Sequence, residues 1–285
     1  MDHCPIPWVK IEGLGNAYLY LEEDAVPEDV WPAVARVLSD PRRGVGADGV
    51  IRVAGGDARP FHMRIWNADG SEAEMCGNGV RGFAKYLFDR GRAPEALTVD
   101  TAAGAIALRV TEVGRDGRAK EVEVDMGEPV LDPAEVPVTG FSSSPVVDEA
   151  LPLAGGPLMV SAVGMGNPHL IHFTHRLWSP EETASLGRLV ETHPWCPRRT
   201  NFHVAVPEGR GRVRVRHWER GSGLTDACGT GASAVLVAGV LSGRLDRAVE
   251  AHLPGGVLDL RWDERDHVMM RGPSRETASG TYWPR

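Results

Sequence analysis

Cysteine is scarce in this 285-residue chain, in which only Cys4, Cys76, Cys196 and Cys228 occur. Four cysteines are too few for a disulfide scaffold in a chain of this length, and none forms the Cys-x-x-Cys pair of a zinc or thioredoxin site. Zinc binding would also need more clustered ligands than the sequence offers. Each cysteine therefore has to be judged by its own neighbours.

Long apolar runs and dense basic runs are also missing. No stretch approaches the roughly 18 uninterrupted apolar residues that span a bilayer, and residues 1–10 lack the charged start and apolar core of a secretory signal. The formal net charge of -8, without a run of Lys or Arg, argues against a nucleic-acid or membrane partner. With 42% hydrophobic and 25% charged residues the composition is globular, so we expect a cytoplasmic protein that acts on a small molecule.

The sequence repeats itself, because segments of the first half recur about 150 residues later in the second half. The matching pairs are residues 13–16 with 164–167, 63–67 with 214–219, 74–79 with 226–231 and, more loosely, 48–49 with 200–201. Cys76 and Cys228 are equivalent in this alignment, and Asn67 and Glu219 fall at equivalent strand ends.

A repeat of this length predicts an α/β (α+β) fold of two similar lobes that face one another across a cleft. We expect residues 1–126 to form the N-terminal lobe with Cys76, residues 127–274 the C-terminal lobe with Cys228, and the tail 275–285 to pack on the first lobe. Strand-like segments dominate both halves, and helices are expected over residues 28–39, 80–90, 180–192 and 232–243. The Pro/Gly/Ser-rich stretch 129–156 is expected to be a weakly structured connection.

Both cysteines precede a predicted helix in a Cys-Gly-x-Gly segment. At a helix N-terminus, unpaired backbone N–H groups and the helix dipole stabilise a thiolate, which lowers the thiol pKa from roughly 8.5. The same N–H groups can bind a substrate carboxylate. A small buried core residue is the ordinary interpretation of a lone cysteine, but packing gives no reason to keep cysteine and glycines together in both halves.

Two thiols on opposite faces of one carbon suit the inversion of a stereocentre. A thiolate removes the proton from one face while the opposing thiol supplies a proton to the other. A pyridoxal phosphate enzyme would instead need a Schiff-base lysine and a phosphate-binding loop. Lys10, Lys85 and Lys120 do not lie beside such a loop, so no cofactor is expected.

These residues resemble those of the diaminopimelate epimerase family. The resemblance runs from residue 10 to about residue 256, and its most specific segments are 67–72 leading into 76–79, 166–169, and 219–221 leading into 227–231. It implies two pseudo-symmetric lobes, each a β-barrel-like sheet wrapped around a central helix. It also implies a homodimer, without metal or organic cofactor, that interconverts LL- and meso-2,6-diaminopimelate in lysine and cell-wall precursor biosynthesis.

The resemblance assigns the site residue by residue. Cys76 and Cys228 would be the acid-base pair. The donors to the carboxylate at the reacting centre would be Gly77, Asn78, Gly229 and Thr230. The residues that would hold the distal amino-acid group are Asn16, Asn67, Asn167, Asn201, Glu219 and Arg220. An arginine fork suits a carboxylate, whereas a glutamate and amide oxygens accept from an ammonium group. His169 resembles a family histidine near the cysteines that would help set their protonation, although a lone histidine is more often structural.

The chain departs from the family pattern at several positions near the expected cleft. Ala17-Tyr18 stands where the family usually has Asp-Phe, and Gly49 where some members have glutamine. Leu224 replaces a common glutamate, and His203 lies in what is typically a plainer strand sequence. We expect these changes to adjust the rim of the site without changing the reaction.

Other functions stay open at this point. The nearest is an epimerase or racemase of the same fold that acts on another amino acid, such as histidine or proline. Such a substrate would not need Arg220, Glu219 and four asparagines together. An isomerase of this fold that lacks the cysteine pair is disfavoured because both cysteines are present. A thiol redox protein is a further class, since two facing thiols can form a disulfide. Cys4 and Cys196 lack any motif and are assigned to structure.

Overall fold

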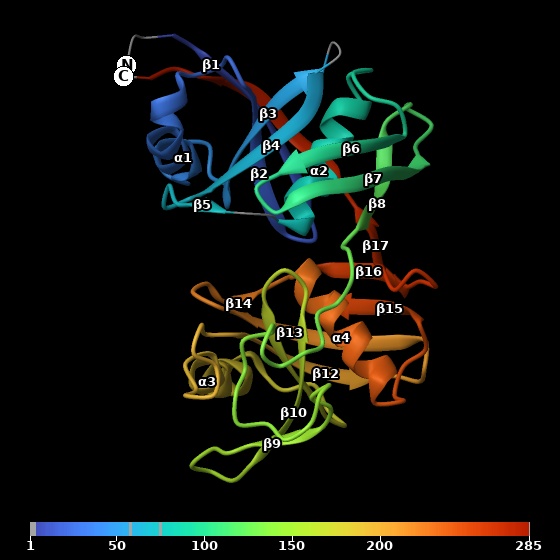
Figure 1. The fold of residues 1–285 in the computed structure, drawn as a ribbon. Coiled ribbons are helices and arrows are strands. Elements are labelled where there is room, and N and C mark those ends of the chain that lie inside the picture. Colours follow the sequence, from blue (N-terminus) through green and yellow to red (C-terminus); the bar gives the residue numbers. More distant parts are fainter. Residues whose placement is uncertain (1–3, 57–58, 74–75, 285) are drawn as a thin grey trace. The chain divides into compact units, whose positions relative to one another are not determined.

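The computed structural model describes residues 4–56, 59–73 and 76–284. The chain divides into two compact units (Figure 1). Unit 1 comprises Met1–Val124 together with Gly272–Arg285, and unit 2 comprises Asp125–Arg271. No helix of the described residues is both long and apolar enough to cross a bilayer.

Unit 1 is a run of paired strands that surrounds helix α2. Its elements are β1 (Ile6–Gly13), β2 (Asn16–Glu22), the short 3-10 helix η1 (Glu28–Val30), α1 (Trp31–Ser39), β3 (Gly49–Gly56), β4 (Arg59–Asn67), β5 (Glu72–Ala73), α2 (Gly77–Phe88), β6 (Ala96–Thr101), β7 (Gly104–Val113), β8 (Ala119–Asp125) and β18 (Arg275–Tyr282). β2 runs parallel to β3 and β4 runs parallel to β6. The pairs β1–β2, β1–β18, β3–β4, β4–β5, β6–β7 and β7–β8 are antiparallel.

Unit 2 repeats this arrangement around helix α4. Its elements are β9 (Glu149–Leu151), β10 (Leu158–Gly164), β11 (Pro168–Phe173), α3 (Pro180–Glu191), β12 (Asn201–Pro207), β13 (Arg212–Glu219), β14 (Gly223–Thr225), α4 (Gly229–Leu241), β15 (Ala248–Leu253), β16 (Gly256–Trp262) and β17 (Val268–Pro273). β11 runs parallel to β12 and β13 runs parallel to β15. The pairs β9–β10, β10–β11, β12–β13, β13–β14, β15–β16 and β16–β17 are antiparallel.

The order and direction of strand pairing from β1 to β8 recur from β10 to β17, which confirms the duplicated plan inferred from the sequence. α1 corresponds to α3, and α2 corresponds to α4. Each central helix follows a short strand of two or three residues, β5 in unit 1 and β14 in unit 2. Cys76 and Cys228 therefore occupy the same place in the two units.

Both central helices are buried, but they differ in the side chains that they bury. α4 is apolar on every face, as a helix enclosed on all sides must be, and it contacts β10, β11, β12, β13, β15 and β16. α2 carries buried polar side chains, among them Arg81 and Lys85, which bond within unit 1. Lys85 Nζ donates to Asp89 Oδ2 and to the carbonyl of Ala119, both at 2.7 Å, so its charge is paired.

Two expectations from the sequence need correction. The central helices begin at Gly77 and Gly229, three residues earlier than expected, because the glycines that looked like loop residues form the first helical turn. The stretch 129–156 contains only the short strand β9 but is not loosely packed. Val136, Val138 and Val146 are 1%, 3% and 1% exposed and join the core cluster of unit 2, so apolar burial orders a segment that has little regular structure.

Candidate active site

Both candidate catalytic cysteines cap their helices in the same way. Cys76 is the N-cap of α2 and its Sγ accepts from the Gly79 backbone N–H at 3.4 Å. Cys228 is the N-cap of α4 and its Sγ accepts from the Gly231 backbone N–H at 3.3 Å. Both residues have extended backbone torsions, as an N-cap requires. Each sulfur thus accepts from a backbone N–H in the first turn of its helix, at the helix N-terminus where the sequence predicted it.

The surroundings of Cys228 favour the neutral thiol. It is 5% exposed, and burial followed by the charge of Glu219 raises the pKa of Cys228 well above its usual range. The hydroxyl of Thr230 and the N–H of Gly231 lower the pKa, but their effect is smaller than that of burial. The expectation that the helix terminus would lower this thiol pKa is therefore wrong for Cys228, because desolvation outweighs the helix donors.

Glu219 lies next to Cys228 and hydrogen-bonds to it. Burial raises the pKa of Glu219, while hydrogen bonds from Thr225 Oγ1 and from Cys228 lower it. Because a thiol has a higher ordinary pKa than a carboxyl group, and burial raises the pKa of Cys228 as well, the thiol is the donor and the carboxylate the acceptor. The pair can therefore hold one proton on sulfur and one negative charge on Glu219.

Two neighbours of Cys76, a phenol and a guanidinium, can stabilise negative charge on its sulfur. Cys76 is half-buried, and the side chain of Tyr18 hydrogen-bonds to it. Burial, followed by the charge and the hydrogen bond of Cys76, raises the pKa of Tyr18 well above its usual range, so the phenol keeps its proton and donates. A second phenol, Tyr20, donates to the Gly79 carbonyl at 2.7 Å and so helps to hold the first turn of α2.

A buried cation lies near the same thiol. Arg81 is 0% exposed, and burial lowers its pKa to about 10, while the charge of Cys76 opposes that shift. The guanidinium therefore stays charged at neutral pH and stabilises negative charge on Cys76. Arg81 Nη2 also donates to Asn78 Oδ1 at 2.7 Å, and Nη1 donates to the Gly77 carbonyl at 3.4 Å.

The other predicted site residues of unit 1 lie at two strand ends and in the first turn of α2. Asn16 starts β2, and Asn67 ends β4; both are half-buried. Asn67 Nδ2 donates to Ser71 Oγ at 3.0 Å. Gly77 and Asn78 form the first residues of α2 directly after Cys76. Because Asn78 Oδ1 accepts from Arg81, its amide orientation is held within unit 1.

Unit 2 brings together more of the predicted residues. Asn201, which starts β12, donates from Nδ2 to the Pro168 carbonyl at 3.0 Å and accepts at Oδ1 from the Arg220 backbone N–H at 2.8 Å. This amide therefore ties β11 to the turn after β13. The exposed side chain of Arg220 donates to the Arg198 carbonyl at 2.9 Å. Gly229 and Thr230 begin α4 beside Cys228, and Thr230 Oγ1 lies 3.5 Å from its sulfur.

His169 and Asn167 form a hydrogen-bonded pair. His169 is fully buried at the start of β11, and its Nε2 lies 2.6 Å from Asn167 Oδ1. Burial lowers the pKa of His169 to about 3, with smaller contributions from His217 and Arg220, so the ring is neutral.

The sequence did not assign Tyr18, Arg81 or His217 to the site. Tyr18 and His203 stood out only as departures from the family pattern.

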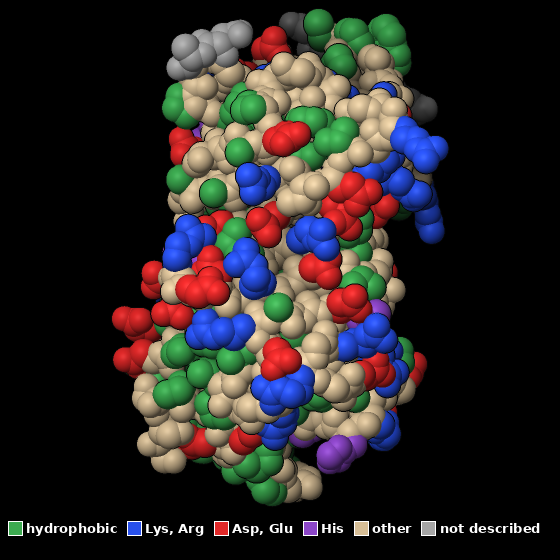
Figure 2. All heavy atoms as spheres, turned by 90° about the vertical axis from the view of Figure 1, so that its right-hand side faces the viewer, with side chains coloured by type: hydrophobic (Ala, Val, Ile, Leu, Met, Phe, Trp, Pro, Cys, Tyr) green, Lys and Arg blue, Asp and Glu red, His purple; other side chains and the backbone are tan. Residues whose placement is uncertain are grey.

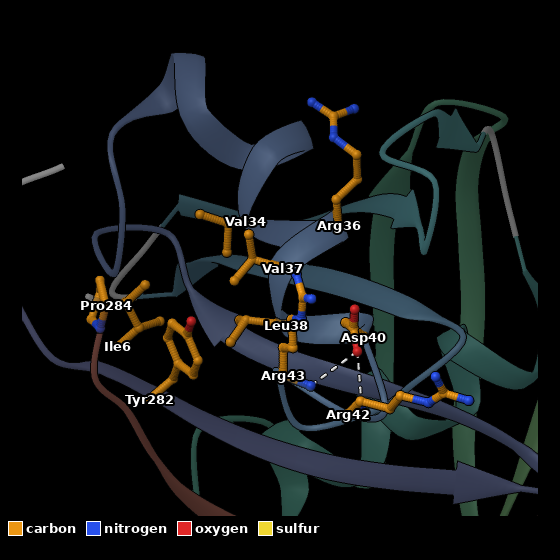
Figure 3. Close-up of a pocket in the computed structure, with 10 residues that line it drawn as sticks. All are labelled: Ile6, Val34, Arg36, Val37, Leu38, Asp40, Arg42, Arg43, Tyr282 and Pro284. Carbon is orange, nitrogen blue, oxygen red and sulfur yellow. Dashed lines mark hydrogen bonds between the residues drawn. The ribbon is translucent and has the colours of Figure 1, made fainter.

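No predicted site residue lines the pocket shown in Figure 3. That pocket, of about 660 Å³, lies between α1 and the C-terminal segment of unit 1, with Val34, Val37 and Tyr282 on its walls.

Among the described residues no cluster of His, Cys, Asp and Glu is suited to hold a metal ion. On the face in Figure 2, basic and acidic side chains are intermingled.

Comparison with known proteins identifies the family. The diaminopimelate epimerase family matches residues 8–131 and 161–276. A diaminopimelate epimerase of Pelotomaculum thermopropionicum is 44% identical over 283 residues, covering 96% of this chain and 98% of the relative. One from Leptospira biflexa is 39% identical over 278 residues, covering 96% and 98%.

Solved structures share the fold at low identity. A hydroxyproline epimerase from Agrobacterium vitis is 15% identical and aligns with a TM-score of 0.68, covering 98% of this chain and 93% of that chain. A phenazine biosynthesis protein of the PhzF family from Bacillus anthracis is 15% identical and aligns with a TM-score of 0.67, covering 98% and 99%. These neighbours agree with the two-lobed α/β fold expected from the sequence. The matches over nearly the whole length, together with the two equivalent capping cysteines, show that the chain belongs to the diaminopimelate epimerase family.

Proposed function

We propose that this enzyme interconverts LL- and meso-2,6-diaminopimelate by moving the α-proton between Cys76 and Cys228, without pyridoxal phosphate or a metal. The observation that carries the proposal is the pair of equivalent N-cap cysteines with opposite electrostatic surroundings. Tyr18 and Arg81 favour a thiolate at Cys76. Burial and Glu219 favour a thiol at Cys228. The resting enzyme thus holds one base and one acid, as a two-base inversion requires.

In this proposal the reaction is a pair of balanced proton transfers. The Cys76 thiolate takes the α-proton from one face of the substrate carbon and becomes a thiol. The Cys228 thiol gives its proton to the opposite face and becomes a thiolate. The reverse reaction starts from the opposite protonation. Negative charge that develops toward the α-carboxylate is stabilised by the backbone N–H groups at Gly77, Asn78, Gly229 and Thr230.

The polar residues around the two helix termini supply the remaining recognition. The guanidinium of Arg220 suits the distal carboxylate, because its exposed fork can bind both oxygens. Glu219 accepts from an ammonium group of the substrate. The amides of Asn16, Asn67, Asn167 and Asn201 complete the binding of the distal amino-acid group, and His169 supports Asn167. Family membership further supports a cytoplasmic homodimer in lysine and cell-wall precursor biosynthesis, in which the two units are the two lobes of each subunit.

The test is to incubate the reduced enzyme with LL-diaminopimelate in D2O, without added pyridoxal phosphate. Chiral separation with mass spectrometry should show meso product carrying deuterium at the inverted carbon. Cys76→Ala and Cys228→Ala should each abolish turnover with the fold retained. Cys196→Ala is the matched control, because Cys196 is a buried core cysteine of unit 2 that caps no helix, and this variant should stay active.

A folded wild-type enzyme with free thiols that gives neither product nor exchange would contradict diaminopimelate as the substrate. The same exchange assay across proline, hydroxyproline and histidine would then identify a racemase of another amino acid. Retention of most of the rate in either cysteine variant would contradict the two-base mechanism.

A further inference from the structure

Unit 2 buries three histidines on three neighbouring strands. His169 lies on β11, His203 on β12 and His217 on β13, and each is 0% exposed. His203 and His217 are direct partners in the β12–β13 register. Their ring centroids are 4.9 Å apart, and those of His169 and His203 are 5.0 Å apart. Such a cluster is unusual because histidine is costly to bury without partners.

Unit 1 shows that the same place in the fold accepts apolar side chains. Ile51 and Ile65 are direct partners in the β3–β4 register, as His203 and His217 are in unit 2. A Cβ added at Gly79 would lie 2.9 Å from Ile51 Cδ1, and one added at Gly231, the equivalent glycine of α4, would lie 2.4 Å from His203 Cε1. Packing against the central helix therefore does not require histidine.

The three rings form an unbroken chain of hydrogen bonds that ends on Asn167. His169 Nε2 lies 2.6 Å from Asn167 Oδ1. His169 Nδ1 lies 2.8 Å from His203 Nε2, and His203 Nδ1 lies 2.8 Å from His217 Nδ1. Burial lowers the pKa of all three rings, to about 3 for His169 and His217 and well below the usual range for His203. Each ring is thus neutral and has one N–H and one acceptor nitrogen.

This connectivity determines every tautomer. Because Asn167 Oδ1 only accepts, His169 donates from Nε2 and must accept at Nδ1. His203 therefore donates from Nε2 and accepts at Nδ1, and His217 donates from Nδ1. The chain ends at His217 Nε2, a buried nitrogen without a hydrogen-bond partner among the described residues. An unpaired acceptor nitrogen is better tolerated there than an unpaired N–H would be. Each hydrogen bond between the rings is therefore donated in the direction of Asn167.

The hydrogen-bonded histidines fix the orientation of Asn167, which lies at the surface end of the hydrogen-bond chain. Asn167 is half-buried in the loop between β10 and β11, and its Oδ1 is held by His169. Its Nδ2 then points away from the ring, and no group in the described part of the chain accepts from it. A fixed amide of this kind presents N–H donors, and not an oxygen, to a ligand. Such donors suit a carboxylate and not an ammonium group.

We propose that His203 and His217 are positioning residues that lock His169 in its Nε2–H tautomer and thereby hold the Asn167 amide with Nδ2 toward a substrate carboxylate. The inference rests on the proposed function, because it takes Asn167 as a substrate ligand. It deepens that function by assigning Asn167 to the carboxylate side of the distal amino-acid group. His203 also packs on Gly231, whose backbone N–H donates to Cys228. The three histidines therefore lie beside the N-cap of α4, where the proposed acid Cys228 is held.

The first measurement is a two-bond ¹H–¹⁵N correlation spectrum of the wild-type enzyme labelled with ¹⁵N-histidine. Single histidine variants assign the signals. We expect His169 and His203 as Nε2–H tautomers and His217 as the Nδ1–H tautomer. An Nδ1–H tautomer at His169 would overturn the proposal. This readout does not depend on turnover, so it stays distinct from the failure of the proposed function, which wild-type inactivity would reveal.

A matched pair of variants tests the link to the substrate. His217→Ile introduces the residue found at the equivalent position in unit 1 and removes the donor. His217→Asn keeps an N–H donor near the position of Nδ1. We expect His217→Ile to raise the KM for diaminopimelate roughly tenfold with kcat little changed, because one hydrogen bond to a charged group is loosened in substrate and transition state alike. His217→Asn should restore the wild-type KM and the His169 tautomer.

Wild-type KM in His217→Ile would refute the positioning role, as would equal effects of both variants. If His217→Ile fails to fold, the tautomers of the wild-type enzyme still decide the question. Ile51→Val in unit 1 serves as the packing control, and it should leave KM and the histidine signals unchanged.

Discussion

Replacing Tyr18 by phenylalanine probes the feature that separates Cys76 from Cys228. Tyr18 is 7% exposed and hydrogen-bonds to Cys76 from the neighbouring strand β2. Burial and the charge of Cys76 raise the pKa of Tyr18 well above its usual range, so the phenol remains a donor at every working pH. The substitution removes one hydroxyl, and the ring keeps its volume.

The magnitude follows from the loss of one charge-assisted hydrogen bond. Such bonds contribute about 1.5–3 kcal/mol, which corresponds to a factor of roughly 10 to 100 in the ratio of thiolate to thiol. Cys76 keeps the Gly79 N–H at 3.4 Å and the nearby Arg81 charge, so we expect the lower end of that range. The charged form becomes less stable, and the alkylation profile of Cys76 therefore moves to higher pH.

The assay is alkylation by iodoacetamide from pH 5 to pH 10, with each cysteine peptide quantified by mass spectrometry. Below its midpoint, Cys76 of Tyr18→Phe should react about tenfold more slowly than in the wild type. Cys196 is an internal control, because burial raises its pKa to about 12 and it should stay unlabelled in the folded protein. Tyr20→Phe is the matched control, since its hydroxyl donates to the Gly79 carbonyl and not to the sulfur.

An unchanged Cys76 profile in Tyr18→Phe would refute the reasoning, as would an equal shift in Tyr20→Phe. The first result would show that Arg81 and the helix donors alone hold the charge. The second would show that both phenols act through the packing of α2 and not through a bond to sulfur.

Four further substitutions, two of them combined in a double variant, test unit 2. Glu219→Gln removes the charge that raises the Cys228 pKa, so Cys228 should be alkylated at lower pH than in the wild type; a shift to higher pH would contradict the proposed pairing. Arg220→Ala should raise the KM for diaminopimelate roughly 10- to 100-fold through loss of a charged fork, and an unchanged KM would reopen the identity of the substrate. Gly231→Ala places a Cβ 2.4 Å from His203 Cε1 and should cost about 1–3 kcal/mol of unfolding free energy in thermal or urea melts. Addition of His203→Ala should recover part of that loss, and strict additivity of the two changes would show that they do not touch.

Local chemistry explains what could be predicted from the sequence. The repeated Cys-Gly-x-Gly segments specify a capped helix through neighbours only a few residues away, and both helices formed where expected to within one turn. The duplication was visible because equivalent turns and strand ends keep their residues. Strand-like segments were expected in both halves, but the ends and partners of the strands were not, because periodicity alone does not separate a short stretch such as β17 from a loop and says nothing of pairing.

The sequence by itself determined the family, the equivalence of Cys76 and Cys228 at helix N-termini, and the duplicated order of elements. These features depend on residues that lie close together in the chain. Only the tertiary structure decided how each group behaves. Strand register aligned His203 with His217 and so created the chain to Asn167. Packing brought Tyr18 to Cys76 and Glu219 to Cys228. Ionisation depends on burial and on neighbours in space, so two cysteines in similar sequence contexts have different electrostatic surroundings.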